Sequence, residues 1–167
     1  MPACNKDSHI NDVLALPEEA HVEHIEKEYQ VNIHPEGEGG LSHTEERHSH
    51  TGSRNYLEHR LKTEKIEAAT KFVSKEALRS SRHRWLETFS AEMHGVMEPQ
   101  DGDRFSARIE FRDSVGVGIQ RDGAEIKEMK KVVFVYEWRT QQKTWCEITG
   151  YPTVSQEEPD VAWHDAI

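Results

Sequence analysis

Apolar residues in the first half of the chain recur at helical spacing. Pro17 followed by two glutamates is typical of a helix start, because proline fits the first turn and acidic side chains favour the positive end of the helix dipole. We expect this helix to run to about Tyr29, on a stripe that contains Val22 and Ile25. Residues 1–16 have no sustained period and are expected to be weakly ordered.

Further helices are expected up to residue 97. The pattern predicts a short helix over residues 44–48, and Ser53 is suited to cap a second helix. Residues 66–73 fit either a strand or a buried turn. Ser74 is suited to cap a long helix over residues 76–97, whose apolar stripe contains Leu78, Trp85, Leu86, Phe89 and Met93.

The second half of the chain alternates apolar and polar residues, as half-buried strands do. This alternation predicts strands over residues 105–111 and 115–119. Two more strands, over residues 132–138 and 144–149, face each other across a short polar turn, which predicts a hairpin. Helices followed by strands indicate an α+β fold, with N-terminal helices followed by an antiparallel β-sheet.

Composition indicates one domain with a modest core, since 35% of the 167 residues are hydrophobic. No apolar run approaches the length of a membrane span. The first residues lack the basic and apolar pattern of a secretory signal, so a cytoplasmic location is expected. Cys4 and Cys146 are expected to be free thiols, because two cysteines cannot form the disulfide framework of a small secreted protein.

Charge is distributed unevenly along the chain, whose formal net charge is -10. Residues 1–40 carry nine acids and two bases, and residues 155–167 carry four acids and no Lys or Arg. Residues 41–84 carry ten bases against six acids and form the only basic block. A basic block within an acidic chain is suited to bind a phosphate-containing partner.

The basic block contains a histidine cluster preceded by two glycines. His43, His48 and His50 lie on either side of Arg47, and Arg60 follows. Histidine takes and gives a proton near neutral pH, and arginine offers a planar fork of donors that fits a phosphate. These residues therefore suggest acid–base chemistry on a phosphodiester, although a solvated polar surface with several histidines has the same composition.

Four short motifs follow one another along the chain: Gly39-Gly40, the block from His43-Thr44 to Arg47-His48, Arg60-Leu61, and a strand that ends in Thr149-Gly150-Tyr151-Pro152. In this order they resemble the RNase A-like toxin domains at the C-termini of bacterial contact-dependent growth inhibition proteins. The resemblance extends over residues 39–154. It leaves residues 1–38 as an acidic N-terminal arm with one helix, and residues 155–167 as an acidic tail.

The resemblance implies a compact α+β fold related to pancreatic ribonuclease, without its disulfides. It implies metal-independent cleavage of RNA without a cofactor, with transfer RNA and bulk RNA both open as the substrate, and a cognate immunity protein that blocks the site. Carried over by motif, the family's active-site histidine corresponds to His48 and its arginine to Arg60. The family's threonine and tyrosine correspond to Thr149 and Tyr151.

Two departures from the family pattern bear on this assignment. Leu41 and Ser42 stand between Gly40 and His43, where the family has Gly-Gly-His-Thr. The gap from the active-site histidine to the arginine is also about one residue longer than in the family pattern. A shifted register would make His50 or His43 the working base.

Cleavage of RNA without a metal needs a base for the 2′-hydroxyl, an acid for the departing 5′-oxygen, and positive charge at the phosphorus. The products would be a 2′,3′-cyclic phosphate and a 5′-hydroxyl. His48 would move the proton, with His43 as a candidate for the second transfer, and Arg60 would hold the phosphate. Thr149 would hydrogen-bond a phosphate or a base edge, and Tyr151 would donate to a non-bridging oxygen or orient the histidine.

Two other function classes stay open. A catalytically degenerate domain that keeps the fold as an interaction module would explain the altered Gly-Gly-Leu-Ser-His spacing. A metal-binding module would use the nitrogens of His43, His48, His50 and His59, although their spacing fits no familiar zinc motif. Each candidate residue also has an ordinary structural role open to it, as a solvated or strand-end side chain.

Overall fold

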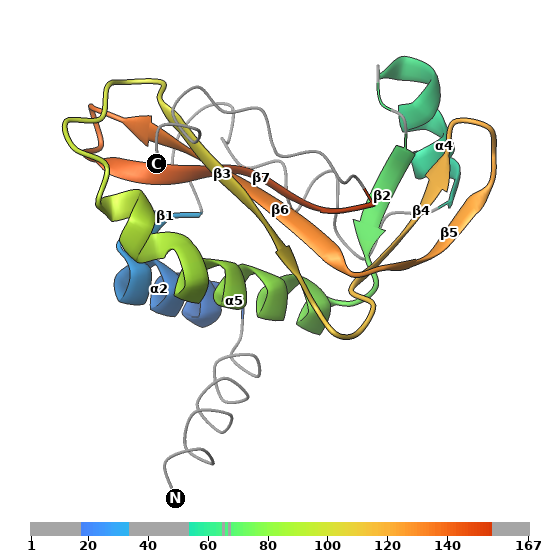
Figure 1. Ribbon diagram of the computed structural model, residues 1–167, viewed down its shortest axis with the longest axis horizontal. Coiled ribbons are helices and arrows are strands. Elements are labelled where there is room, and N and C mark those ends of the chain that lie inside the picture. The colour runs from blue at the N-terminus through green and yellow to red at the C-terminus, as the bar shows by residue number, and fades with distance from the viewer. Residues whose placement is uncertain (1–17, 34–53, 65, 67, 155–167) are drawn as a thin grey trace, which may run out of the picture.

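The computed structural model describes residues 18–33, 54–64, 66 and 68–154. Its helices are α2 (Glu18–Tyr29), α4 (Arg54–Thr63) and α5 (Lys75–His94). Its strands are β1 (Val31–Asn32), β2 (Ala68–Phe72), β3 (Arg104–Glu110), β4 (Gly116–Gln120), β5 (Glu125–Met129), β6 (Lys131–Arg139) and β7 (Thr144–Thr153). Figure 1 shows α2 and α5 on one side of the long β6–β7 ribbon, and α4 beside the far end of that ribbon.

The strands form two sheets. One has the order β1-β7-β6-β3, and the other has the order β2-β4-β5. All pairs are antiparallel except β1 with β7. The predicted α+β class is confirmed, with helices before strands along most of the chain, but the expected single sheet is divided into two.

The main core lies between α5 and the four-stranded sheet. Trp85 of α5 is fully buried, stacks on Tyr136 of β6 at 5.2 Å between ring centroids, and donates from Nε1 to the carbonyl of Ala107 at 2.9 Å. Ser74 caps α5 as expected, since its side chain accepts from the backbone N–H of Ala77 at 3.0 Å. The long predicted helix is therefore confirmed, ending at His94.

The helix expected before Tyr29 is also confirmed, and it packs into the main core. Ile25 of α2, Val31 of β1 and Ile33 are buried in the same cluster as the core residues of α5. Residues 18–33 are therefore a packed part of the fold rather than a free arm. The proposed boundaries at residues 38 and 154 stay predictions.

Two elements were not specified by the sequence patterns. Residues 66–73 were ambiguous, and they contain the strand β2, which pairs with β4 along its whole length. β5 was not predicted, because four of the five residues in Glu-Ile-Lys-Glu-Met are exposed or half-exposed and three are charged. An edge strand with charged side chains has little apolar alternation to detect.

No helix in the described residues is long and apolar enough to cross a membrane. Cys146 is a free, buried thiol, as expected. Cys4 and the short helix expected over residues 44–48 lie outside the described residues.

Candidate active site

An irregularity in β7 determines where Thr149 and Tyr151 point. Val135 of β6 pairs with Thr149, but the next residue, Tyr136, pairs with Glu147, so Ile148 is an extra residue in the ladder. Such a β-bulge reverses which side chains of a strand face each side of the sheet.

The neighbours of β7 show this reversal directly. Before the bulge, Glu147 faces α5. After it, a Cβ added to Gly150 would lie 2.1 Å from the ring of Phe134, which is a core residue beneath the sheet. Because side chains alternate along a strand, Thr149 and Tyr151 point to the opposite face, away from α5. Without the bulge both would point into the core.

A buried ion pair holds the strand next to the bulge. Arg82 of α5 donates from Nε to Glu147 Oε1 at 2.9 Å and from Nη2 to Oε2 at 3.0 Å. The hydroxyl of Tyr136 also donates to Glu147 Oε1, at 3.3 Å. Both side chains of the ion pair are at most 2% exposed. A bidentate pair of this kind fixes position as well as charge.

Tyr151 is half-buried on this face, and burial raises the pKa of its phenol above the usual value. The hydroxyl therefore keeps its proton at neutral pH, the form that can donate a hydrogen bond. Thr149 lies two residues earlier on the same face and is also half-buried. The structure thus brings these two predicted residues together on one surface.

Arg60 lies on α4, where its side chain is only 5% exposed. A buried charge needs a partner, and Arg60 Nε donates at 2.9 Å to Glu64 Oε2, four residues further on and directly after the helix ends. Leu57 and Leu61 form the apolar stripe of α4 and pack against the three-stranded sheet. Arg60 lies next to this stripe on the surface of the helix.

The side of α4 on which Arg60 emerges follows from the helical period. Arg54 emerges beyond the other edge of the stripe and pairs with Glu125 of β5. At 3.6 residues per turn, Arg60 lies about 120° around the helix from Arg54. It therefore lies on the side of α4 away from β5, toward β2.

The two sheets meet where β2 and β4 approach the end of β7. A Cβ added to Gly116 of β4 would lie 2.3 Å from Pro152 of β7, so only glycine allows this approach. Pro152 directly follows Tyr151. Thr149 and Tyr151 thus lie on the strand that reaches this meeting point, whereas Arg60 lies on α4, which packs against β2 and β4.

His48, His43 and His50 lie outside the described residues, so their assignment stays a prediction. Among the residues that the structure describes, no group of three or more His, Cys, Asp or Glu side chains is arranged to hold a metal ion. His59, the fourth histidine of the metal hypothesis, is exposed on α4.

Comparison with known proteins identifies the family of this chain. The model of the bacterial CdiA-CT RNAse A domain matches residues 42–152. The chain belongs to this family. Among solved structures, the crystal structure of the CdiA-CT/CdiI complex from Y. kristensenii 33638 is similar, with a TM-score of 0.56 and 15% sequence identity, covering 65% of this chain and 96% of that chain. No curated protein sequence matches.

The RNase A-like toxin family named from the sequence is therefore confirmed, as is its fold. The matched segment, residues 42–152, contains all four predicted site residues and the two alternative histidines. His43 is the second residue of this segment. Residues 18–33, which pack into the core, lie outside the matched segment.

Two acidic residues near the site were missed from the sequence. Glu64 pairs with Arg60, and a spacing of four residues in a predicted helix was a readable signal for this pair. Glu147 pairs with Arg82 across 65 positions of sequence. No local pattern in the strand indicated that this glutamate is buried.

Proposed function

We propose that this CdiA-CT RNase A domain is a metal-independent endoribonuclease that cleaves RNA by transphosphorylation. The 2′-hydroxyl attacks the adjacent phosphorus, the bond to the 5′-oxygen breaks, and a 2′,3′-cyclic phosphate and a 5′-hydroxyl remain. The observation that best supports this is the family match over residues 42–152, combined with the bulge that turns Thr149 and Tyr151 to one outer face.

Each residue has a role that suits its chemistry. His48 takes the proton of the 2′-hydroxyl, and a second proton donor, for which His43 is the candidate, protonates the departing oxygen. Arg60 stabilises the charge that builds on the phosphate, since its guanidinium is always cationic. Tyr151 donates a hydrogen bond to a non-bridging oxygen, which requires the neutral phenol that its raised pKa maintains.

The proposed substrate follows from the mechanism, and the proposed partner follows from the similar structure. RNA is the substrate class, because the mechanism needs a 2′-hydroxyl next to the phosphate. A cognate immunity protein is the proposed partner, in line with the CdiA-CT/CdiI complex of the similar structure. The proposed place of action is the cytosol of the cell that the domain enters.

The test is RNA cleavage in EDTA by the full chain, beside His48→Ala, His43→Ala and His50→Ala. We expect the wild type to cleave and His48→Ala to lose about 10²–10⁴-fold in rate, the usual contribution of a general acid or base. A comparable loss in His50→Ala, with His48→Ala active, would move the base to His50. Cleavage that stops in EDTA would contradict the metal-independent mechanism.

A second candidate function is an interaction module that has lost activity. It is favoured by the insertion of Leu41 and Ser42 before His43. Absence of cleavage by the wild type and by a variant that starts at residue 18, together with binding of RNA or of a protein partner, would support it.

A further inference from the structure

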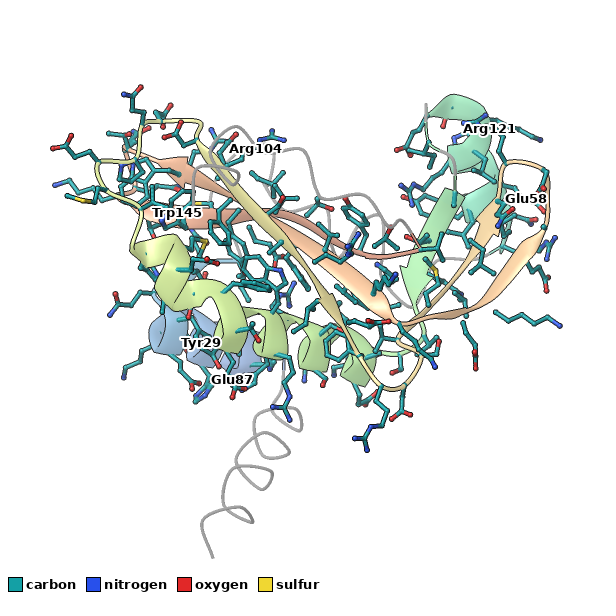
Figure 2. All side chains as sticks on the ribbon, viewed as in Figure 1. Tyr29, Glu58, Glu87, Arg104, Arg121 and Trp145 are labelled. Carbon is teal, nitrogen blue, oxygen red and sulfur yellow. The ribbon has the colours of Figure 1, made fainter. Side chains whose placement is uncertain are left out.

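Arg121 binds the segment that directly follows the helix carrying Arg60. It lies in the turn after β4, exposed, and its side chain reaches back to the segment after α4 (Figure 2). Its Nη2 donates to the carbonyl of Glu64 at 3.0 Å and to the carbonyl of Ile66 at 2.6 Å, and its Nε donates to Ile66 at 3.0 Å. A rigid guanidinium is suited to hold two carbonyls at once.

Arg121 also suits the position electrostatically. The C-terminal end of a helix carries partial negative charge, which a nearby cation stabilises, and the two carbonyls that Arg121 binds directly follow this end of α4. The turn that presents Arg121 is itself well defined. Gly123 adopts φ of 91°, Asp122 Oδ1 accepts from the N–H of Ala124 at 2.9 Å, and the N–H of Gly123 donates to Gln120 at 2.9 Å.

Three groups of Glu64 are hydrogen-bonded in this arrangement: its backbone N–H, its backbone carbonyl and its carboxylate. Its N–H donates to the carbonyl of Arg60 at 2.8 Å, its carbonyl accepts from Arg121, and its carboxylate accepts from Arg60 Nε at 2.9 Å. The backbone and the carboxylate of one residue thus connect the exposed arginine of the turn to the buried arginine of the helix.

We propose that Arg121 and Glu64 are positioning residues that orient the guanidinium of Arg60 toward the scissile phosphate. This inference rests on the proposed ribonuclease function. Glu64 accepts a hydrogen bond from Arg60 Nε, and this bond sets the plane and the direction of the Arg60 guanidinium. Arg121 fixes the backbone of Glu64 beyond the last turn of α4, where helices otherwise fray.

The test is a double-mutant cycle on RNA cleavage, using wild type, Arg121→Ala, Arg60→Ala and the double variant. Arg121→Ala is expected to lower kcat/KM by about 10- to 100-fold, because displacements of about 1 Å in a positioned group have effects of this size. In the Arg60→Ala background the same change is expected to have no further effect. Arg112→Ala, which removes another exposed arginine after β3, is the control and should retain activity.

An equal loss from Arg121→Ala in both backgrounds would show that Arg121 acts on overall folding, and would overturn the proposal, as would no loss at all. Urea unfolding of each variant establishes the folded fraction in the assay. Arg121→Lys, which keeps the charge but loses the fork, is expected to resemble Arg121→Ala.

A second readout does not depend on catalysis. The Nε–H of Arg60, held by Glu64, should give a sharp, slowly exchanging NMR resonance in the wild type and in Arg112→Ala. We expect it to broaden or exchange faster in Arg121→Ala and to be lost in Glu64→Ala. An unchanged resonance in Arg121→Ala would overturn the positioning role. Absence of RNA cleavage by the wild type would instead contradict the proposed function.

Discussion

Removal of the carboxylate of Glu147 is expected to destabilise the protein strongly. Arg82 and Glu147 are 2% and 0% exposed, and they share two hydrogen bonds of 2.9 and 3.0 Å. In Glu147→Leu the guanidinium of Arg82 would stay buried without this partner. Breaking a buried pair from one side costs about 3–5 kcal/mol. For a chain of this size, this corresponds to a fall in Tm of about 6–20 °C.

The assay is thermal and urea unfolding of Glu147→Leu beside the double variant Arg82→Met/Glu147→Leu. Replacing both charges by apolar groups of similar volume is often neutral or stabilising. We therefore expect the double variant to recover most of the lost free energy of unfolding. Tyr136→Phe, added to the double variant, removes the hydroxyl that would otherwise lose its acceptor.

A loss below about 1 kcal/mol in Glu147→Leu would refute this reasoning, since it would mean that Arg82 is readily rehydrated or paired elsewhere. Failure of the double variant to recover would show that the ion pair itself, rather than the unpaired charge, supplies the stability. Because Glu147 adjoins the bulge, recovered stability without recovered RNA cleavage would show that the pair also aims Thr149 and Tyr151.

Three further outcomes follow from individual side chains. Burial, and after it the charge of Glu147, raises the pKa of Tyr136 above its value in the unfolded chain. The contribution of Tyr136 to stability is therefore present below a pH of about 10 and is lost above it. Tyr136→Phe should reduce the loss of stability between a pH of about 10 and 12, and an unchanged profile would contradict this. Burial raises the pKa of the Cys146 thiol to about 11. Alkylation of Cys146 in the folded protein at neutral pH should therefore be far slower than alkylation of a small-molecule thiol. Comparable rates would contradict the burial of Cys146. Gly150→Ala should cost about 1–3 kcal/mol in urea unfolding through overpacking against Phe134, whereas a neutral effect would mean that the ring moves aside.

Long elements with a clear period could be predicted from the sequence. The stripe that contains Trp85 and the Ser74 cap indicated α5, and alternation on both sides of a polar turn indicated the β6–β7 hairpin. These patterns arise from burial of one face, which leaves a record in residue order. β1 leaves no such record, because two residues are too few to show a period.

The candidate site was predictable only in part. Motif order indicated Arg60, Thr149 and Tyr151, but alternation alone places the odd-numbered residues of β7 on one face throughout. The extra residue Ile148 changes that face, and the anchor of the bulge lies on α5. Contacts between distant segments, such as Arg121 with Glu64, likewise depend on the fold and leave no local spacing.

The most direct test of the central claim compares two substrates in EDTA: an RNA oligonucleotide and the same oligonucleotide with a single 2′-deoxy nucleotide on the 5′ side of the cleaved phosphate. The account predicts a 2′,3′-cyclic phosphate from the RNA, identified by mass spectrometry, and no cleavage at the modified position. Cleavage at the 2′-deoxy nucleotide, or products with a linear phosphate from the earliest time points, would contradict attack by the 2′-hydroxyl.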